Sequence, residues 1–512
     1  MAKVEKVEWH DVQGLVLSGY PRLPFSAYIP WQFGSGDRLS WKSWLRGIAD
    51  RVVSVEAVGR SKINGRFGGG VRPGCLAAIK VLSQSESALA DVWVLNIALT
   101  ASGLARLGVG QEELCLFSAE FREGMAPQAT TKGAPSRRSN ILGDIGVNSP
   151  LHWRWGGWSA NGRIDGMLLL YAGSGASLQR LVQWEVEQMK GIDLLSSDSG
   201  HRSLVLEGRI YEDRREHFGF KDGISQPIIV GTKEGDERRK ISHREERISL
   251  VRPGEFVLGY LNERHSRVSY ALSGPHGPKG GAGAMRDLGR NGTYLVFREL
   301  EQNVCAFRRA MSRIALELKG DDSEENRNWV AARFVGRMPD GEPLISASGH
   351  RSATKDRNDF LYYFEDPYGL ACPLGAHIRR ANPRDLLGPT PDAALRLSKM
   401  HRIIRRGRPY GKRASKSDQT QNERHGLLFI CLNADIAGQF ELIQHSWINN
   451  GRFNGLQGES DPVMHYPGED RLLTIQRKPT SDGIVGLDQF VVVRGGAYFF
   501  LPGLTALRSL AG

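Results

Sequence analysis

The chain has 512 residues, of which 40% are hydrophobic and 24% are charged, which is ordinary for a globular protein with one large domain or two smaller ones. Its 68 Lys and Arg outnumber its 56 Asp and Glu and give a net charge of +12. Because the charges are spread along the chain, we interpret the excess as surface solvation, and we keep a nucleic-acid-binding protein as an alternative from a different class.

Cysteine spacing and hydropathy argue against a zinc-binding, a disulfide-rich or a membrane-spanning protein. The five cysteines are scattered, odd in number and without a CxxC pair, so neither a structural zinc site nor a disulfide framework is expected. No window approaches the roughly 18 apolar residues of a membrane span, and the N-terminal stretch MAKVEKVEWHDVQGLVLSGY has no apolar run of signal-peptide length. The sequence therefore predicts a cytoplasmic protein with no membrane partner.

Strands and helices alternate irregularly in the first half of the chain. Apolar residues at helical spacing predict helices, and short alternating or continuous apolar runs predict strands. The glycine-, proline- and tryptophan-rich stretch 122–164 is expected to be irregular. We expect strands at 12–20, 75–83, 91–99 and 162–173, and helices at 39–52, 101–109 and 177–191.

A charged stretch, 232–247, precedes the second half, and we interpret it as a solvated linker. The final residues, 504–512, are expected to form a closing helix. Residues 488–503 predict either a strand pair or one strand with a Gly-Gly bulge. Between these segments we expect strands at 291–300 and 425–435 and helices at 305–318 and 436–450.

Both halves contain the order strand, helix, strand, and residues 91–109 and 426–444 occupy similar places in them. The mixed order favours an α+β fold with antiparallel sheets over a doubly wound fold. We therefore predict two ferredoxin-like domains, an N-terminal one over 1–235 and a C-terminal one over 236–512.

A first candidate for chemistry is GFKDG, Gly219 to Gly223, around Asp222. Glycines allow positive φ angles and let the backbone come close to a flat or bulky ligand. The plainer interpretation is a tight turn with a solvated aspartate, and this motif alone does not separate the two.

A second candidate is ACPLGAHIRRANPRD, residues 371–385, which contains His377. A lone histidine is more often a satisfied polar residue than a ligand. Here small residues precede it, and Arg379 and Arg380 follow it and are suited to hold anionic groups of a cofactor. A third candidate is RIIRRGRPYG, residues 402–411, whose arginines are interpreted mostly as surface residues, unless one faces inward and pairs with Asp222.

These three motifs, in this order, resemble the signature set of the dye-decolorizing peroxidases. Further similar segments span nearly the whole chain, among them DVQGLVLSGY, LNIALTASGLARLG and GGAYFFLPGL. The resemblance implies haem b bound between two ferredoxin-like domains, mainly by the C-terminal one. The length and the internal excursions are similar to those of the larger intracellular members.

Carried over residue by residue, the resemblance implies that His377 is the proximal ligand of the haem iron. It implies that Asp222 is the distal carboxylate and that Arg405, in preference to Arg406, is the distal arginine. Gly223 and Arg379 are implied to contact the cofactor. A carboxylate commonly hydrogen-bonds a ligating histidine, and Asp461 is the first candidate for that role, with Glu459 second.

The implied activity is the reduction of hydrogen peroxide coupled to the oxidation of bulky aromatic or dye-like donors. A carboxylate base predicts an acidic optimum, and Trp447 and Tyr498 are candidate electron relays to a buried haem. The alternative is a haem-binding or iron-handling protein without peroxidase turnover, which needs His377 but neither Asp222 nor Arg405. The oligomeric state and the natural reductant stay open.

Overall fold

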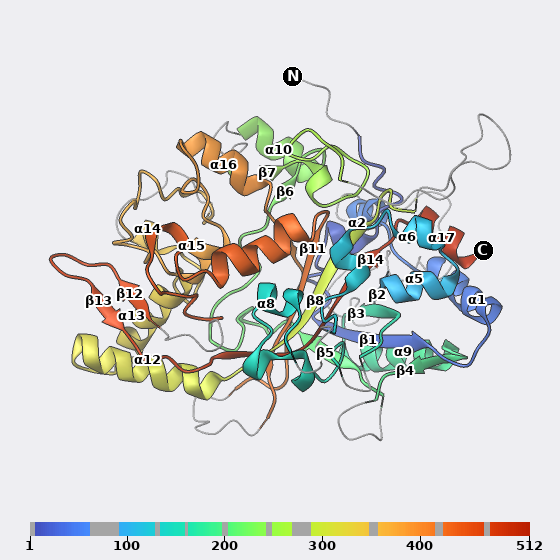
Figure 1. Cartoon of the computed structure of the whole chain (residues 1–512), viewed down its shortest axis with the longest axis horizontal. Coiled ribbons are helices and arrows are strands. Elements are labelled where there is room, and N and C mark those ends of the chain that lie inside the picture. The colour runs from blue at the N-terminus through green and yellow to red at the C-terminus, as the bar shows by residue number, and fades with distance from the viewer. Residues whose placement is uncertain are drawn as a thin grey trace.

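A computed structural model describes residues 6–61, 92–128, 134–158, 162–196, 203–241, 248–268, 288–347, 357–414, 423–464 and 472–512 (Figure 1). A mixed α+β architecture is built on one 10-stranded sheet, in which all strand pairs are antiparallel. The strand order is β10-β11-β8-β14-β2-β3-β1-β4, with β5 beside β1 and β9 beside β11.

The first half contributes the order β2-β3-β1-β4 to this sheet. Its sequence β1, α1, β2, β3, α9, β4 and this spatial order are those of a ferredoxin-like unit. Helix α1 begins where Asp37 accepts a hydrogen bond from the Ser40 amide, 2.7 Å away. The bounds are β1 Phe25–Phe33, α1 Arg38–Ala49, β2 Trp93–Leu99, β3 Gly166–Ala172, α9 Gly175–Gln188, β4 Ile192–Leu194 and β5 Leu206–Arg209.

The second half repeats this arrangement with the order β10-β11-β8-β14. Asn303 caps the first long helix of this half by accepting a hydrogen bond from the Ala306 amide. The α+β class with two ferredoxin-like units is therefore confirmed, whereas the boundary at 235/236 stays a prediction. The bounds are β8 Thr293–Gln302, α12 Val304–Lys319, β9 Ile404–Arg405, β10 Arg408–Tyr410, β11 Gly426–Asn433 and β14 Val491–Leu501.

Shorter elements surround the sheet. The small strands β6 Ile228–Ile229 and β7 Leu250–Val251 pair in parallel, and β12 Leu473–Ile475 and β13 Asp482–Ile484 form a hairpin. The remaining α-helices are α2 Val55–Ser61, α5 Ala101–Leu107, α6 Gln111–Leu114, α7 Ala119–Glu123, α8 Arg137–Leu142, α10 Lys233–Ile241, α13 Glu324–Val335, α14 Leu344–Ala347, α15 His377–Ala381, α16 Pro391–Lys399 and α17 Leu504–Ala511.

Strand β14 joins the two halves. It runs along the whole of β8 on one side and meets β2 at the pair Phe500 and Leu99 on the other. Its register against β8 shifts between Val493 and Gly495. A Cβ atom on Gly495 would lie 2.4 Å from Nε1 of Trp155, so this position has room only for glycine. Residues 488–503 thus contain one bulged strand, the second of the two predicted alternatives.

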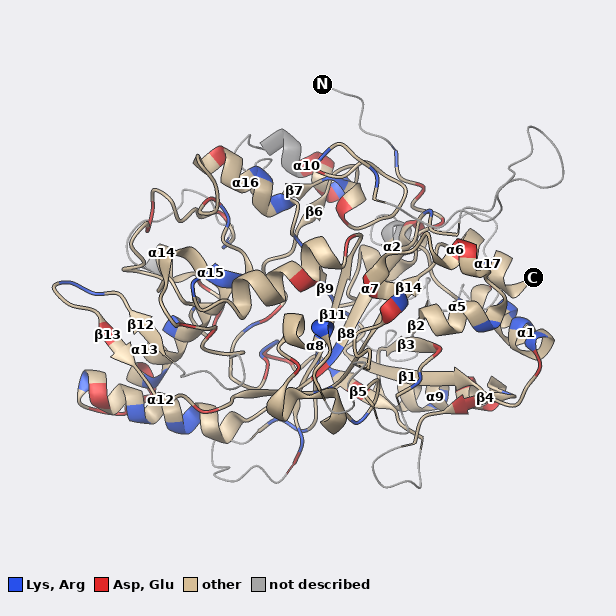
Figure 2. Ribbon diagram, in the orientation of Figure 1, with Lys and Arg blue, Asp and Glu red and all other residues tan. Residues whose placement is uncertain are grey.

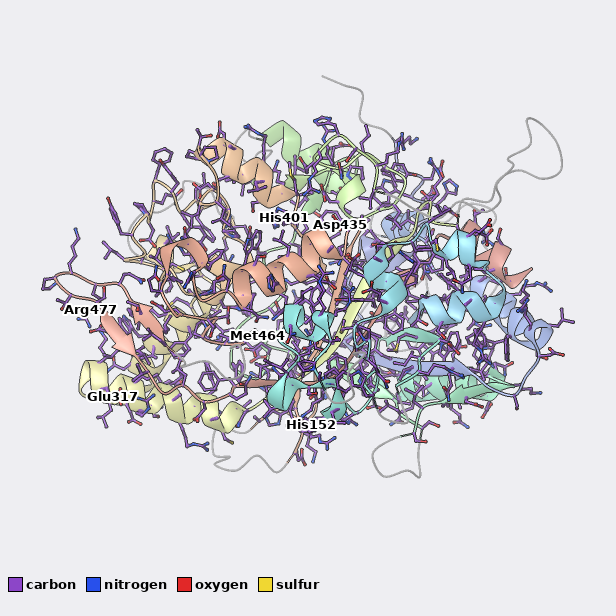
Figure 3. All side chains as sticks on the ribbon, viewed as in Figure 1. His152, Glu317, His401, Asp435, Met464 and Arg477 are labelled. Carbon is purple, nitrogen blue, oxygen red and sulfur yellow. The ribbon has the colours of Figure 1, made fainter. Side chains whose placement is uncertain are left out.

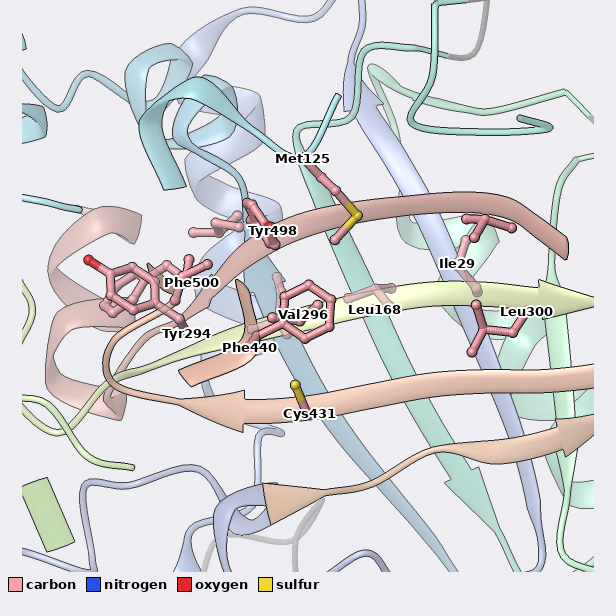
Figure 4. Packing of buried hydrophobic residues seen from close by; sticks show 14 of the residues in the cluster. Ile29, Met125, Leu168, Tyr294, Val296, Leu300, Cys431, Phe440, Tyr498 and Phe500 are labelled. Carbon is pink, nitrogen blue, oxygen red and sulfur yellow. The ribbon is translucent and has the colours of Figure 1, made fainter. Parts of the chain in front are cut away.

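Both faces of the sheet are buried, and successive side chains of each strand point to opposite faces. Tyr294, Val296 and Leu300 of β8 point to the face that carries the helices, where they pack beside Phe500 of β14 (Figure 4). The opposite face is covered mostly by irregular chain, including residues 7–23 and 251–260, and by part of α2. On the face that carries the helices, Leu300 and Gln302 at the end of β8 line a cavity.

Two predicted elements are wrong. Residues 12–20 form no strand, because the buried Gln13 side chain exchanges two hydrogen bonds with the Ile97 backbone and a short 3₁₀ turn follows at Gly14–Val16. The predicted linker 232–247 contains helix α10. Residues 436–450 are helical as predicted, but with π-type turns at Ala437–Glu441 and Ile443–Ile448. The strand predicted at 75–83 lies outside the described residues.

Charged side chains of both signs are interspersed over the ribbon (Figure 2). The net charge of +12 is therefore not concentrated in a single element. Among the described residues, no helix is both long enough and apolar enough to cross a bilayer.

Candidate active site

A cavity of about 300 Å³ lies between the C-terminal part of the sheet and the helices that cover it. Its walls come from β8, β11 and β14, from α15 and the π-helical segment, and from residues 216–225 of the first half. His401 and Met464, which are labelled in Figure 3, line it from two further segments. The apolar lining side chains include Phe218, Phe220, Leu300, Leu427, Phe429, Phe440, Ile443, Trp447 and Val463.

His377 is the first residue of α15 and lines this cavity. Its Nδ1 lies 2.9 Å from Oδ2 of the fully buried Asp461. Burial lowers the pKa of His377, but the Asp461 carboxylate outweighs burial, so the pKa lies above its ordinary value. The other candidate partner, Glu459, instead accepts hydrogen bonds from the amide and hydroxyl of Thr474. The structure therefore brings Asp461 to His377 and not Glu459.

Arg379 and Arg380 hold α15 in place from outside the cavity. The Arg379 guanidinium is fully buried, forms an ion pair with Asp366 at 2.9 Å and donates to the Cys372 carbonyl. Arg380 donates to four backbone carbonyls, among them Trp447 of the neighbouring π-helical segment. Neither side chain lines the cavity, and the expectation that Arg379 or Arg380 holds an anionic group of a cofactor stays a prediction.

Asp222 and Arg405 face each other at the cavity wall, with Nη1 of Arg405 2.8 Å from Oδ1 of Asp222. Burial alone would raise the pKa of Asp222, but the Arg405 guanidinium outweighs it and holds the pKa below its ordinary value. Arg406 points to the other side of the strand, where it donates to the carbonyls of Leu15 and Val16. Of the two candidate arginines, only Arg405 meets Asp222.

The turn that presents Asp222 is held by the buried carboxylate of Glu216. This carboxylate accepts hydrogen bonds from the amides of Phe218 and Phe220, both at 2.9 Å. Gly219 and Gly223 have φ angles of +101° and +76°, which side chains other than glycine rarely adopt. The Gly223 amide donates to Oδ1 of Asp222 at 2.6 Å. Gly223 thus fixes the carboxylate, although it does not itself line the cavity.

Four further arginines line the cavity and were not singled out from the sequence: Arg298, Arg337, Arg384 and Arg402. No described carboxylate forms an ion pair with Arg402. Burial lowers its pKa to about 9, and the charges of Arg384 and Arg405 lower it further. An apolar cavity lined by Arg402, a cation with no ion pair to a described carboxylate, fits a flat apolar macrocycle that carries carboxylates. His377 offers this macrocycle a nitrogen ligand. The residues present therefore fit haem.

The two candidate relays lie at different depths. Trp447 is buried, lines the cavity and meets the His401 ring edge-on, with the ring centroids 5.5 Å apart. Tyr498 is buried behind the lining residue Phe440, and its hydroxyl donates to Glu441 at 2.8 Å. Neither side chain reaches the surface.

A histidine held by a buried carboxylate shares one cavity with an aspartate–arginine pair and with further arginines, and this set of groups suits a haem peroxidase. No family model matches the chain. A multifunctional dye peroxidase of Amycolatopsis sp. is 30% identical over 436 residues, which cover 81% of this chain and 82% of that protein. A dye-decolorizing peroxidase of Mycena epipterygia is 28% identical, covering 82% of this chain and 76% of that protein.

The chain belongs to the dye-decolorizing peroxidase family. It is an oxidoreductase that acts on hydrogen peroxide, and its cofactor is haem b. The fold agrees: a solved dye-decolorizing peroxidase in complex with 2,6-dimethoxyphenol superposes with a TM-score of 0.71 at 21% identity, covering 99% of this chain and all of that one.

Proposed function

We propose that His377 binds the haem iron through Nε2 and that Asp222 and Arg405 act on the bound peroxide. The observation that carries this proposal is that the His377–Asp461 and Asp222–Arg405 pairs line one apolar cavity. When bound, haem b supplies the redox-active iron at which the O–O bond breaks. Side chains of this protein orient the iron ligand, move the proton and stabilise the developing charge.

Asp461 has two effects on His377. Its carboxylate accepts the hydrogen bond from Nδ1, which fixes the tautomer and leaves the lone pair of Nε2 for the metal. Its negative charge makes the imidazole a stronger electron donor. Arg379 and Arg380 fix the start of α15, so the ring is oriented by the backbone as well as by Asp461.

Asp222 moves the proton. It is ionised at neutral pH, so it would take a proton from one oxygen of hydrogen peroxide and return it to the other oxygen, which leaves as water. Arg405 stabilises the negative charge that develops on the leaving oxygen. General acid–base help of this kind contributes about 10²- to 10⁴-fold in rate. In the complete cycle, one hydrogen peroxide, two protons and two electrons from donor molecules give two water molecules.

The reducing substrates we propose are bulky aromatic donors such as dyes and phenols. The named complex of a solved relative with 2,6-dimethoxyphenol supports a phenolic donor. The net charge of +12 favours anionic dyes through electrostatic steering, so their oxidation is expected to slow as salt is added. Trp447, which lines the cavity, is the better placed of the two candidate relays.

We also propose a cytoplasmic location. The support is that the four cysteines within the described residues are free, which fits a reducing compartment.

The experiment that tests the roles compares Asp222→Ala and Arg405→Leu with the unaltered protein at equal haem content. Both variants are expected to react with hydrogen peroxide at least about 100-fold more slowly in stopped flow. His377→Ala should lose the absorption band of the bound haem. If neither distal variant slows the reaction, the roles of Asp222 and Arg405 are wrong and the iron-handling alternative, which needs only His377, gains support.

A further inference from the structure

The side-chain amide of Gln226 makes two reciprocal hydrogen bonds with the backbone of Arg405. Its Oε1 accepts from the Arg405 N–H at 3.0 Å, and its Nε2 donates to the Arg405 carbonyl at 3.2 Å. Gln226 therefore pairs with Arg405 as a neighbouring strand would. Four positions before it in the chain stands Asp222, whose carboxylate meets the side chain of the same arginine.

Arg405 needs such a partner because β9 is only two residues long and pairs with β11 on one side. Arg405 lies opposite Cys431 of β11, and the next residue, Arg406, donates its amide to the Ile430 carbonyl at 2.7 Å. The N–H and C=O of Arg405 point away from β11 toward Gln226. Without the Gln226 amide, the N–H of Arg405 would lose its hydrogen-bond partner, and its C=O would keep only Nη1 of Arg406, at 3.2 Å. The position of β9 would then be less well fixed.

Gln226 is itself well anchored. Pro227 follows it, and the Ile228 amide then donates to the Ser249 carbonyl at 3.0 Å, where β6 pairs with β7. At the other end of the segment, Nε2 of Gln302 on β8 donates to the Glu216 carboxylate at 2.6 Å. The segment 216–226 is thus tied at both ends, and Asp222 lies between the ties.

We propose that Gln226 is a positioning residue that sets the Arg405 guanidinium at Asp222. The proposal rests on the role given above to Arg405. A neutral primary amide suits the task because it offers one acceptor and one donor on the same edge, matching a backbone N–H and C=O. A carboxylate lacks the donor, and the amide of asparagine is one methylene too short to span the same gap.

The test is Gln226→Met, which keeps the length of the side chain and removes both hydrogen bonds. Gln13 supplies a control outside the cavity, because its buried amide makes the same reciprocal pair with Ile97, at 3.0 and 3.1 Å. It also bonds Pro502 and Asn96, so its loss should cost at least as much stability. Both variants are expected to lower the thermal unfolding temperature. Only Gln226→Met is expected to slow the reaction of the haem-loaded protein with hydrogen peroxide, by about tenfold or more.

Fluoride affinity, read from the absorption spectrum of the haem-loaded protein, gives a measurement independent of turnover, since a bound anion also needs the Arg405 donor. We expect Gln226→Met to weaken fluoride binding about tenfold and Gln13→Met to leave it unchanged. In an Arg405→Leu background, Gln226→Met should add nothing to either measurement, because its effect passes through Arg405.

The outcomes separate this inference from the proposed function. If Arg405→Leu changes both measurements and Gln226→Met changes neither, the role of Gln226 is wrong and that of Arg405 stands. An equal loss from Gln226→Met with and without Arg405 would mean that Gln226 acts by another route, which also overturns the inference. If Arg405→Leu itself changes neither the peroxide rate nor the fluoride affinity, the role proposed for Arg405 is wrong, and the inference about Gln226 is wrong with it.

Discussion

The buried Asp461 pairs with His377 across 84 residues of sequence, with Oδ2 of the carboxylate 2.9 Å from Nδ1 of the ring. Both remaining hydrogen bonds of the carboxylate come from backbone: Oδ1 accepts from the amides of Val463 and Met464. One carboxylate oxygen is therefore fixed by the chain, and the other is left to hold the imidazole. This arrangement sets the electron-donating power of His377.

Replacing Asp461 with Asn keeps an acceptor for Nδ1 and removes the negative charge. We expect the reduction potential of the haem-loaded protein to rise and the rate with hydrogen peroxide to fall about 10- to 100-fold. Spectroelectrochemical titration measures the potential. Glu459→Gln is the control, because Glu459 bonds Thr474 and not His377. An equal rise in both variants would contradict the assignment of Asp461.

The pH dependence of the peroxide reaction should depend on Arg405. With its pKa held below the ordinary value, Asp222 stays ionised as the pH falls, and the rate is expected to drop only as the pH passes through that lowered pKa. In Arg405→Leu, burial loses its main opposing charge and the Gly223 amide remains, so the pKa of Asp222 rises and the acid limb moves to higher pH. The measurement is the second-order rate constant across pH at equal haem content, with Arg405→Lys as a charge-preserving control. An unshifted limb in the Leu variant would count against this account, as would a rate maximum above neutrality in the unaltered protein.

Arg402 should select for the carboxylates of the cofactor. Arg402→Leu is expected to bind haem at least about tenfold more weakly but haem dimethyl ester, which lacks the charges, as well as the unaltered protein does. The apoprotein should become more stable, because the buried cation no longer has to be desolvated without a partner. Titration of the apoprotein with both compounds and thermal unfolding check this. A uniform loss of affinity for haem and ester would disprove the assignment.

Glu255 gives a pH effect on stability away from the site. Its side chain is 1% exposed, and burial raises its pKa to about 7. The folded protein therefore binds an extra proton between the ordinary pKa of Glu and about pH 7, so stability falls as the pH rises through this window.

Glu255→Gln should therefore raise stability at pH 8 by about 3 kcal/mol and change it little at pH 5. The Gln side chain keeps an acceptor for the Glu263 amide, which donates to Oε1 at 2.9 Å. Thermal unfolding at both pH values provides the measurement. An equal gain at pH 5 would show that packing, and not ionisation, is responsible.

The sequence predicts the parts of the fold that follow from periodicity. Strands such as β3 and β8 are recognised because their apolar runs are buried on both faces, and α1 is recognised because Trp41, Trp44 and Ile48 recur at helical spacing. Residues 12–20 mislead because they are apolar, yet the segment meets β2 through the buried Gln13 side chain, which pairs with the Ile97 backbone. This is a tertiary contact with no local signature in the sequence.

The candidate site likewise contains residues that the sequence predicts and residues that it does not. Asp222, His377 and Arg405 lie in motifs that a resemblance can align, and the structure brings each to the cavity. Arg402 escaped notice because the basic stretch around it has the composition of a solvated face. Gln226 escaped because an amide that bonds backbone groups leaves no pattern in the sequence. Nothing in the sequence indicates that the Arg379 guanidinium forms an ion pair with Asp366, because the two residues lie 13 positions apart.

The placement of β14 in the middle of the sheet has a consequence for synthesis on the ribosome. This strand lies between β8 and β2, and the Thr505 amide and hydroxyl that follow it both bond Asp11 at 2.7 Å. Until residues 491–505 have left the exit tunnel, β8 and β2 each keep an unpaired edge, and the N-terminal segment lacks its partner. The nascent chain must therefore be protected from edge-to-edge association for most of its translation, and the haem cavity, whose wall includes Val491, closes only at its end.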